Sequence, residues 1–166
     1  MTTRPNIILF LTDDHGAWAN RCYGNQEVHT PHLDKLANIG ARFEHAYTPS
    51  PVCSPARACL LTGKTPSQVG IHDWLEERDA TIANRNWLRD IPTLFRLMAD
   101  AGYRTALSGK WHLGQSHTKP DGVDEYFGLP HWQGTHNDPY MYLDDNEFVE
   151  LKGNKSAHIT NRALSI

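Results

Sequence analysis

The stretch that decides the fold spans residues 92–108 and reads PTLFRLMADAGYRTALS. Its proline opens a helix, apolar side chains recur at helical spacing over residues 94–101, and Gly102 supplies a terminator. Residues 103–108 then predict a strand. A helix that leads directly into a strand is the repeating unit of α/β proteins, so we expect an α/β sheet.

The sequence before this stretch extends the alternation of strands and helices. Residues 6–11, NIILFL, are a continuous β-prone run that predicts a central strand covered on both faces. Residues 31–39 predict a short amphipathic helix that Thr30 caps and Gly40 ends. In residues 41–48, side chains with aromatic rings alternate with charged or small side chains, which predicts a half-buried strand.

The remaining segments predict one more helix and several loops. Three prolines precede a predicted helix over residues 56–62, which Gly63 ends, so Cys53 lies at a helix N-terminus. Residues 65–90 show no clear period and predict a long surface excursion. Residues 109–139 are rich in Gly, His, Trp, Asp and Pro, which predicts loops.

The end of the sequence predicts a further helix, for which Thr160 is the N-cap and no stop signal follows. No internal repeat or linker divides the sequence. We therefore expect residues 1–166 to belong to one domain that is truncated inside an element.

Composition excludes several classes of function. The 166 residues carry 16 Lys and Arg against 19 Asp and Glu, a net charge of −3 that disfavours nucleic-acid binding. The longest apolar run near the start covers only residues 7–11, far short of the roughly 20 residues that span a bilayer. No membrane association and a cytoplasmic location are expected, because no signal-peptide pattern is present. Three cysteines without paired spacing argue against a disulfide framework and a structural zinc site.

Adjacent carboxylates follow the predicted first strand. Asp13 and Asp14 lie at its carboxyl end, where open α/β sheets bind ligands. A hard cation such as calcium or magnesium would relieve the repulsion between the two side chains. The alternative is a solvated turn in which one aspartate caps the backbone, and for an isolated Asp-Asp pair this alternative is favoured.

A thiol at a helix N-terminus forms a second candidate site. Cys53 is followed by Pro55 and, one helical turn later, by Arg57. A helix N-terminus and a nearby cation both lower a thiol pKa and attract anions, so Cys53 could act as a nucleophile. It could equally be a small buried residue beside a proline turn.

The third candidate is the hexapeptide GKWHLG at residues 109–114, directly after the predicted strand 103–108. Lys110 can neutralise an oxyanion, and His112 can donate a hydrogen bond or a proton near neutral pH. An exposed turn between strand and loop explains the hexapeptide as well.

Together these segments resemble the type I sulfatases of the alkaline phosphatase superfamily. The first strand with its Asp-Asp pair, the Cys-x-Pro-x-Arg signature from Cys53 to Arg57 followed by Leu-Thr-Gly, and the GKWHLG segment stand in the family's order and spacing. The similarity covers most of residues 4–114. It implies an alkaline-phosphatase-like fold, a mixed and mostly parallel sheet with helices on both faces, of which this chain holds the N-terminal part.

The resemblance also implies a mechanism for hydrolysing sulfate esters. A separate maturation enzyme would oxidise Cys53 to formylglycine, whose hydrate would be the nucleophile. Asp13 and Asp14 would hold a divalent cation, usually calcium with magnesium possible, which Cys53 in its modified form also contacts. Arg57 would orient the modified residue, and Lys110 and His112 would bind the hydrate and the sulfate of a small-molecule or carbohydrate substrate.

Other readings of the sequence remain open. The family's later metal ligands match no segment here, and a ligand role for the His136-Asn137-Asp138-Pro139 stretch is disfavoured. A phosphonate monoester or phosphodiester hydrolase would share the nucleophile, the cation and the fold. A chain without half of the metal site could also be an inactive fragment or a binding remnant.

Overall fold

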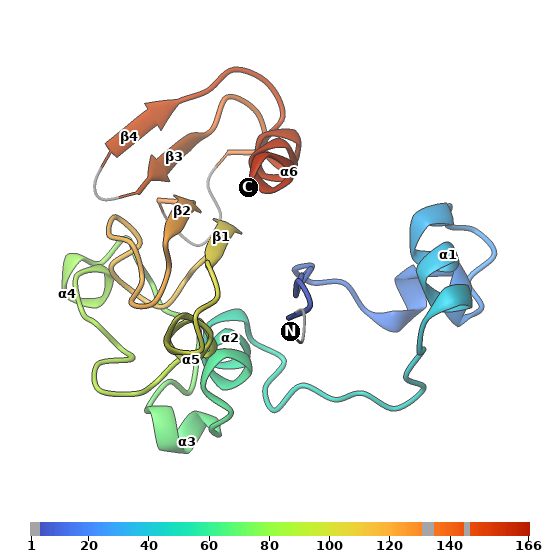
Figure 1. Cartoon of the computed structure of the whole chain (residues 1–166), viewed down its shortest axis with the longest axis horizontal. Helices are drawn as coiled ribbons and strands as arrows, with labels where there is room; N and C mark the ends of the chain where they lie inside the picture. Colours follow the sequence, from blue (N-terminus) through green and yellow to red (C-terminus); the bar gives the residue numbers. More distant parts are fainter. Residues whose placement is uncertain (1–3, 131–134, 145–146) are drawn as a thin grey trace. The chain divides into compact units, whose positions relative to one another are not determined.

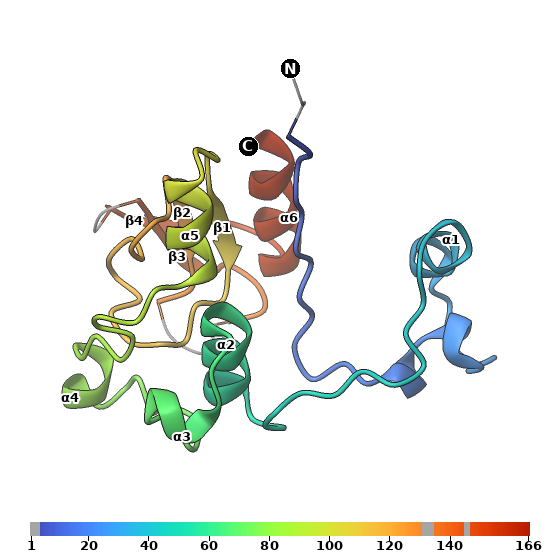
Figure 2. The ribbon, with the colours of Figure 1, turned by 60° about the horizontal axis from the view of Figure 1, so that its bottom comes forward.

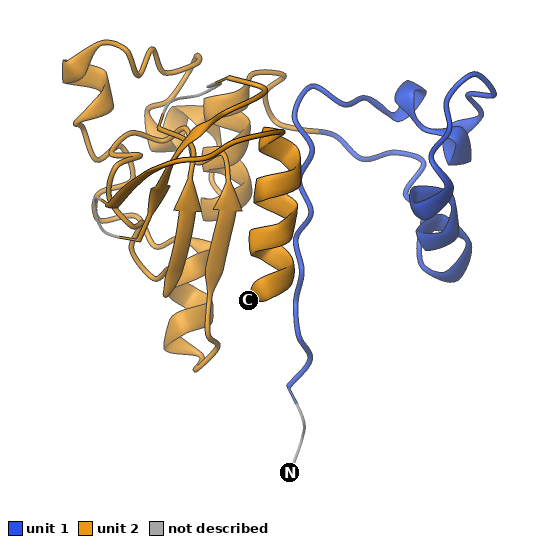
Figure 3. Cartoon of the chain, turned by 90° about the horizontal axis from the view of Figure 1, so that it is seen from above, with its two compact units in different colours: residues 1–47 blue, residues 48–166 orange. Residues whose placement is uncertain are grey.

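The structure is a computed structural model that describes residues 4–130, 135–144 and 147–166. The chain divides into two compact units, residues 1–47 and residues 48–166, which Figure 3 draws in blue and orange. Each unit is described by itself. None of the helices in the described ranges is long and apolar enough to cross a membrane.

Unit 1, residues 1–47, is built from short helices. Two 3-10 turns, η1 (Ala17–Ala19) and η2 (Arg21–Tyr23), precede the α-helix α1 (Pro31–Ile39). The helix begins with a proline after Thr30 and ends before Gly40, as its sequence predicts, but the predicted cap is wrong, because the Thr30 side chain accepts no hydrogen bond from the first turn of the helix. The backbone N–H of Arg21 donates to the Thr30 hydroxyl at 3.0 Å and ties η2 to the start of α1.

The strands predicted in unit 1 are wrong. Residues 6–11 and 41–48 contain no strand, and their large apolar side chains are exposed, with Ile8 at 90%. A strand needs a neighbour to accept and donate its backbone hydrogen bonds, and neither segment is paired with another in the described residues. The run of β-prone residues indicates a tendency to pair without supplying the partner.

Unit 2, residues 48–166, holds a small mixed sheet and five helices among its described residues (Figure 1). The helices are α2 (Cys53–Thr62), α3 (Pro66–Val69), α4 (Ala80–Ala83), α5 (Leu94–Asp100) and α6 (Lys155–Ser165). The strands are β1 (Ala106–Gly109), β2 (Glu125–Gly128), β3 (Tyr140–Leu143) and β4 (Glu147–Glu150).

The sheet has the order β1-β2-β3-β4. Strands β1 and β2 run parallel, whereas β3 pairs antiparallel with both β2 and β4. Successive side chains of a strand point to opposite faces, so Leu107 and Ser108 of β1 mark the two faces. Leu107 packs into a core with residues of α2 and α5, and the Ser108 hydroxyl donates to the Ile159 carbonyl of α6 at 2.8 Å.

Helices therefore cover both faces of the sheet, which confirms the α/β class (Figure 2). The larger core joins α2, the segment after α3 and the loop after β1; its buried members are Ala58, Val69, Ile71, Leu75, Leu88, Trp111 and Leu113. A smaller core lies on the other face, where Phe127, Leu129 and Met141 pack against Ile159.

Several elements of unit 2 differ from the sequence-based prediction. Residues 109–139, expected to be loops, contain β2. Residues 65–90, expected to be a surface excursion, contain the short helices α3 and α4. No element was predicted where β3 and β4 lie. Helix α6 begins after Asn154, whose side chain accepts from the Ala157 N–H, and not after Thr160. Asp138 accepts from the Gly153 N–H at 2.7 Å, so it closes the base of the β3–β4 hairpin.

Candidate active site

Cys53 is the first residue of α2 and is partly buried. Its own helix leaves the backbone N–H groups of the first turn without intrahelical partners, which gives this end a partial positive charge. Cys22, Cys53 and Cys59 are free thiols. Cys59, on the same helix, is buried, and burial raises its thiol pKa, which keeps it in the unreactive protonated form.

Arg57, one turn into α2, links this helix to the residue that follows β1. Its Nη1 donates a hydrogen bond to the Lys110 carbonyl oxygen at 2.9 Å, across 53 positions of sequence. In Figure 2 the carboxyl end of β1 points toward α2, in agreement with this contact. The structure thus joins Arg57, of the candidate site at Cys53, to Lys110, of the separate candidate site at residues 109–114.

The loop that follows β1 adopts an unusual backbone conformation. His112 has φ of 60° and Gln115 has φ of 50°, both in the left-handed region that non-glycine residues seldom occupy. Gly114 has φ of +77°, and a Cβ atom there would overlap the Arg85 carbonyl oxygen. The glycine at this position is therefore required by backbone geometry and by close packing.

His112 is only 1% exposed. Its Nε2 lies 2.8 Å from the Leu75 carbonyl oxygen, and because a carbonyl can only accept, Nε2 carries the proton of this hydrogen bond. In the neutral imidazole the lone pair is then on Nδ1. Nδ1 is the atom of His112 that can gain or lose a proton without breaking this contact.

The sequence did not single out Ser54, Leu75 or Glu77, although these residues surround the predicted site. The Leu75 N–H donates to the Ser54 hydroxyl oxygen at 3.0 Å, and Ser54 is completely buried next to Cys53. Glu77 is also buried and accepts from the Gly114 N–H at 2.9 Å. A carboxylate in an otherwise aperiodic segment carried no signal that could have identified this role.

The environment of Glu77 changes its acidity. Burial raises the pKa of this carboxyl group, while hydrogen bonds from Gly114 and Ser116 and the positive charge of Lys110 oppose the rise. The pKa of Glu77 is raised overall, so its desolvation has a larger effect than the hydrogen bonds and the Lys110 charge together.

Asp13 and Asp14 lie in unit 1, in an exposed segment, and Asp14 has φ of 51°. Carboxylate oxygens are the donors that calcium and magnesium prefer, so the chemistry of this pair fits a hard cation. Two carboxylates supply only part of a calcium shell of roughly 6–8 oxygens. No group of three or more His, Cys, Asp or Glu side chains suited to a metal occurs in the described parts of the chain.

Comparison with known proteins identifies the family. The family model described as Sulfatase matches residues 5–166. The chain belongs to the sulfatase family. An N-acetylglucosamine-6-O-sulfatase of Bacteroides thetaiotaomicron is 39% identical over 166 residues, 99% of this chain and 27% of the relative. A human steryl-sulfatase is 41% identical over 138 residues, 76% of this chain and 24% of that protein.

Two solved structures share the fold of this chain. The structure of BT4656 in complex with its substrate D-glucosamine-2-N,6-O-disulfate matches with a TM-score of 0.84 and 36% identity, over 98% of this chain and 31% of that one. Ps i-CgsB matches with a TM-score of 0.89 and 26% identity, over 98% of this chain and 41% of that one. The family and the alkaline-phosphatase-like fold expected from the motifs are thereby confirmed. The chain spans about a quarter of the curated relatives it matches.

Proposed function

We propose that the whole protein hydrolyses sulfate esters of carbohydrates and that Cys53, oxidised to formylglycine by a separate maturation enzyme, supplies the nucleophile. The observation that carries this proposal is the position of Cys53 at the start of α2, with Arg57 one turn away and bonded to the backbone of Lys110. Membership of the sulfatase family supports the same reaction class. The formylglycine hydrate, when present, provides a hydroxyl that can attack sulfur and a second one that can later expel sulfate.

The described side chains provide the electrostatic part of this chemistry. A transferring sulfuryl group spreads negative charge over its oxygens, and fixed positive groups stabilise that charge more in the transition state than in the substrate. Arg57, Lys110 and the N-terminus of α2 are three such groups in unit 2. His112 can exchange a proton through Nδ1 while Nε2 keeps its bond to Leu75.

We also propose a divalent cation, calcium or in its place magnesium, held by Asp13 and Asp14 and by the modified Cys53. The donor chemistry of the aspartate pair supports this assignment. Such a cation would contribute Lewis-acid stabilisation of the sulfate oxygens. The further oxygen ligands that calcium needs would come from outside the described residues.

The proposed substrate is a 6-O-sulfated amino sugar. This choice rests on the relatives, because an N-acetylglucosamine-6-O-sulfatase matches 99% of the chain and the matched solved structure BT4656 binds a glucosamine disulfate. A human N-acetylgalactosamine-6-sulfatase is also 38% identical over 143 residues. The human steryl-sulfatase, at 41% identity, makes a steryl sulfate the necessary comparison substrate.

The test is to produce the whole protein together with a formylglycine-generating enzyme and to measure sulfate release. We expect turnover of N-acetylglucosamine 6-sulfate, and we expect Cys53→Ala to abolish it while Cys22→Ala leaves it largely intact. The peptide that contains Cys53 should lose about 18 Da when the thiol becomes an aldehyde. An active preparation in which this peptide keeps its thiol mass would refute the mechanism.

Two further substrates separate the alternatives. Preferential hydrolysis of an aryl phosphonate over the matched aryl sulfate would assign the protein to the phosphonate and phosphodiester hydrolases. Absence of turnover with every ester, despite complete conversion of Cys53, would favour an inactive or binding role.

A further inference from the structure

Glu77 is a buried carboxylate for which the proposed chemistry has no use. The residue is 3% exposed, and its side chain enters the loop that follows β1. Oε1 accepts from the Gly114 N–H at 2.9 Å and from the Ser116 hydroxyl at 3.2 Å, and Oε2 also lies 3.2 Å from that hydroxyl. Burying a carboxylate is unfavourable unless its oxygens are satisfied, so these contacts require a specific explanation.

The segment that carries Glu77 also contacts the neighbourhood of the nucleophile. Two residues earlier, the Leu75 N–H donates to Ser54, the residue after Cys53, and the Leu75 carbonyl accepts from His112 Nε2. The backbone N–H and carbonyl of Leu75 and the side chain of Glu77 therefore connect the first turn of α2 to the loop that carries His112. Residues 75–77 therefore contact both of these parts of unit 2.

The loop that follows β1 needs contacts from other segments to keep its backbone conformation. His112 and Gln115 both have positive φ, a conformation that persists only where surrounding contacts enforce it. Arg57 holds the start of this loop through the Lys110 carbonyl, and Glu77 holds its end through Gly114 and Ser116. The backbone between Lys110 and Gly114 is thus fixed at both ends.

We propose that Glu77 is a positioning residue, whose buried carboxylate anchors the end of the loop after β1 and so fixes Lys110 and His112 relative to Cys53. This inference rests on the sulfatase activity proposed above. A carboxylate suits the task because both of its oxygens accept and its negative charge strengthens the hydrogen bonds from the Gly114 N–H and the Ser116 hydroxyl. Glutamine at the same place keeps one acceptor oxygen but loses the negative charge and the second acceptor, so it holds the Gly114 N–H and the Ser116 hydroxyl less strongly.

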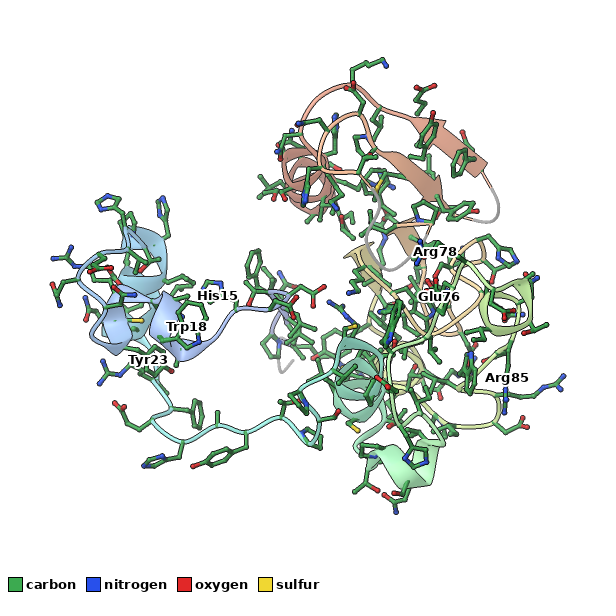
Figure 4. The ribbon with its side chains drawn as sticks, turned by 180° about the vertical axis from the view of Figure 1, so that it is seen from behind. His15, Trp18, Tyr23, Glu76, Arg78 and Arg85 are labelled. Carbon is green, nitrogen blue, oxygen red and sulfur yellow. The ribbon has the colours of Figure 1, made fainter. Side chains whose placement is uncertain are left out.

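Hydrogen exchange tests the structural step without any reference to activity. In the whole protein, Glu77→Gln should speed amide exchange in the peptide that covers residues 110–116, with the Gly114 amide affected most. Glu76→Gln is the matched control, because it removes the same charge from the adjacent residue. Figure 4 labels Glu76 beside Arg78, and this exposed pair, at 2.8 Å, has no part in the loop. Unchanged exchange in the Glu77 variant would overturn the proposal.

Kinetics tests the catalytic consequence. Misplacing reacting groups by about 1 Å can cost on the order of 100-fold in rate, so we expect Glu77→Gln to lower kcat by about 10- to 100-fold while KM changes little. A purely structural role would lower the melting temperature and leave kcat per folded molecule unchanged. That result would overturn the proposal, and so would a similar loss of kcat in Glu76→Gln.

A double-mutant cycle identifies the group through which Glu77 acts. If the carboxylate works by placing His112, Glu77→Gln should cost much less in a His112→Ala background than in the native protein. Fully additive losses would contradict this step. Ser116→Ala provides a milder variant if Glu77→Gln folds poorly, because it removes one of the two anchored donors and should show the same pattern with a smaller loss.

Failure of the proposed function would look different. In that case the native protein with converted Cys53 would release no sulfate, whereas the exchange measurement on Glu77→Gln would still report whether the loop is anchored.

Discussion

Replacing Ser54 with alanine isolates one buried hydrogen bond next to Cys53. Ser54 has no exposed surface, and its hydroxyl oxygen accepts from the Leu75 N–H at 3.0 Å. The substitution removes a single oxygen and leaves the Leu75 N–H buried without this acceptor. Because both residues are buried, we expect neither water nor another side chain to replace the lost acceptor in the variant.

The expected loss follows from that geometry. A buried donor that loses its acceptor costs about 1–3 kcal/mol, which is more than the roughly 0.5–1.5 kcal/mol that a hydrogen bond contributes on average. We therefore expect Ser54→Ala to lower the free energy of unfolding by about 1–3 kcal/mol. Exposed Ser67 in α3 is the matched control, and Ser67→Ala should change stability by less than about 0.5 kcal/mol.

The same variant separates stability from maturation. Position 54 is the first variable position of the Cys-x-Pro-x-Arg signature, so Cys53 should still be converted to formylglycine. The assays are denaturant unfolding of the whole protein and mass spectrometry of the Cys53 peptide. A stability loss in Ser54→Ala no larger than in Ser67→Ala would refute the role assigned to the Leu75–Ser54 bond.

Three further predictions follow from charges and backbone geometry. Because burial raises the pKa of Glu77, the folded state holds its proton more tightly than the unfolded state, so stability should fall as pH rises from about 4.5 through the folded-state pKa. Glu77→Gln should remove this fall in denaturant unfolding measured over a pH series. Asp13→Asn or Asp14→Asn should each weaken calcium binding in calorimetric titration without a matching loss of thermal stability, and unchanged affinity in both variants would refute the metal assignment. Gly114→Ala should destabilise the protein by more than the roughly 1–2 kcal/mol of a left-handed residue, because its Cβ would overlap the Arg85 carbonyl; equal melting temperatures would contradict this.

Local chemistry accounts for the features that the sequence predicts correctly. Helix α1 begins with a proline and ends before Gly40, and Gly63 is the left-handed C-cap of α2, although α2 begins at Cys53 and not at the predicted residue 56. Such signals act within a few residues, so they can be read without knowledge of the fold. The motifs around Cys53 and Lys110 are equally local, which is why the resemblance to sulfatases was visible in the sequence.

Pairing between distant segments was beyond sequence reasoning. The apolar run 6–11 has strand character and forms no strand, whereas β2, in a region predicted to be loops, becomes a strand by pairing with β1. Whether a segment becomes a strand depends on a partner that can lie anywhere in the chain. The same limit applies to the larger core, which unites α2 with the loop after β1.

The connections within the candidate site depend on tertiary structure for a related reason. Arg57 bonds to the backbone of Lys110, and His112 bonds to the backbone of Leu75, so neither contact requires a particular partner side chain. Every residue carries a carbonyl group, and no residue type marks the one that will be used. The sequence names the reactive groups of this chain, and only the folded backbone, by bringing Leu75 and Glu77 between α2 and the loop after β1, determines how those groups are held.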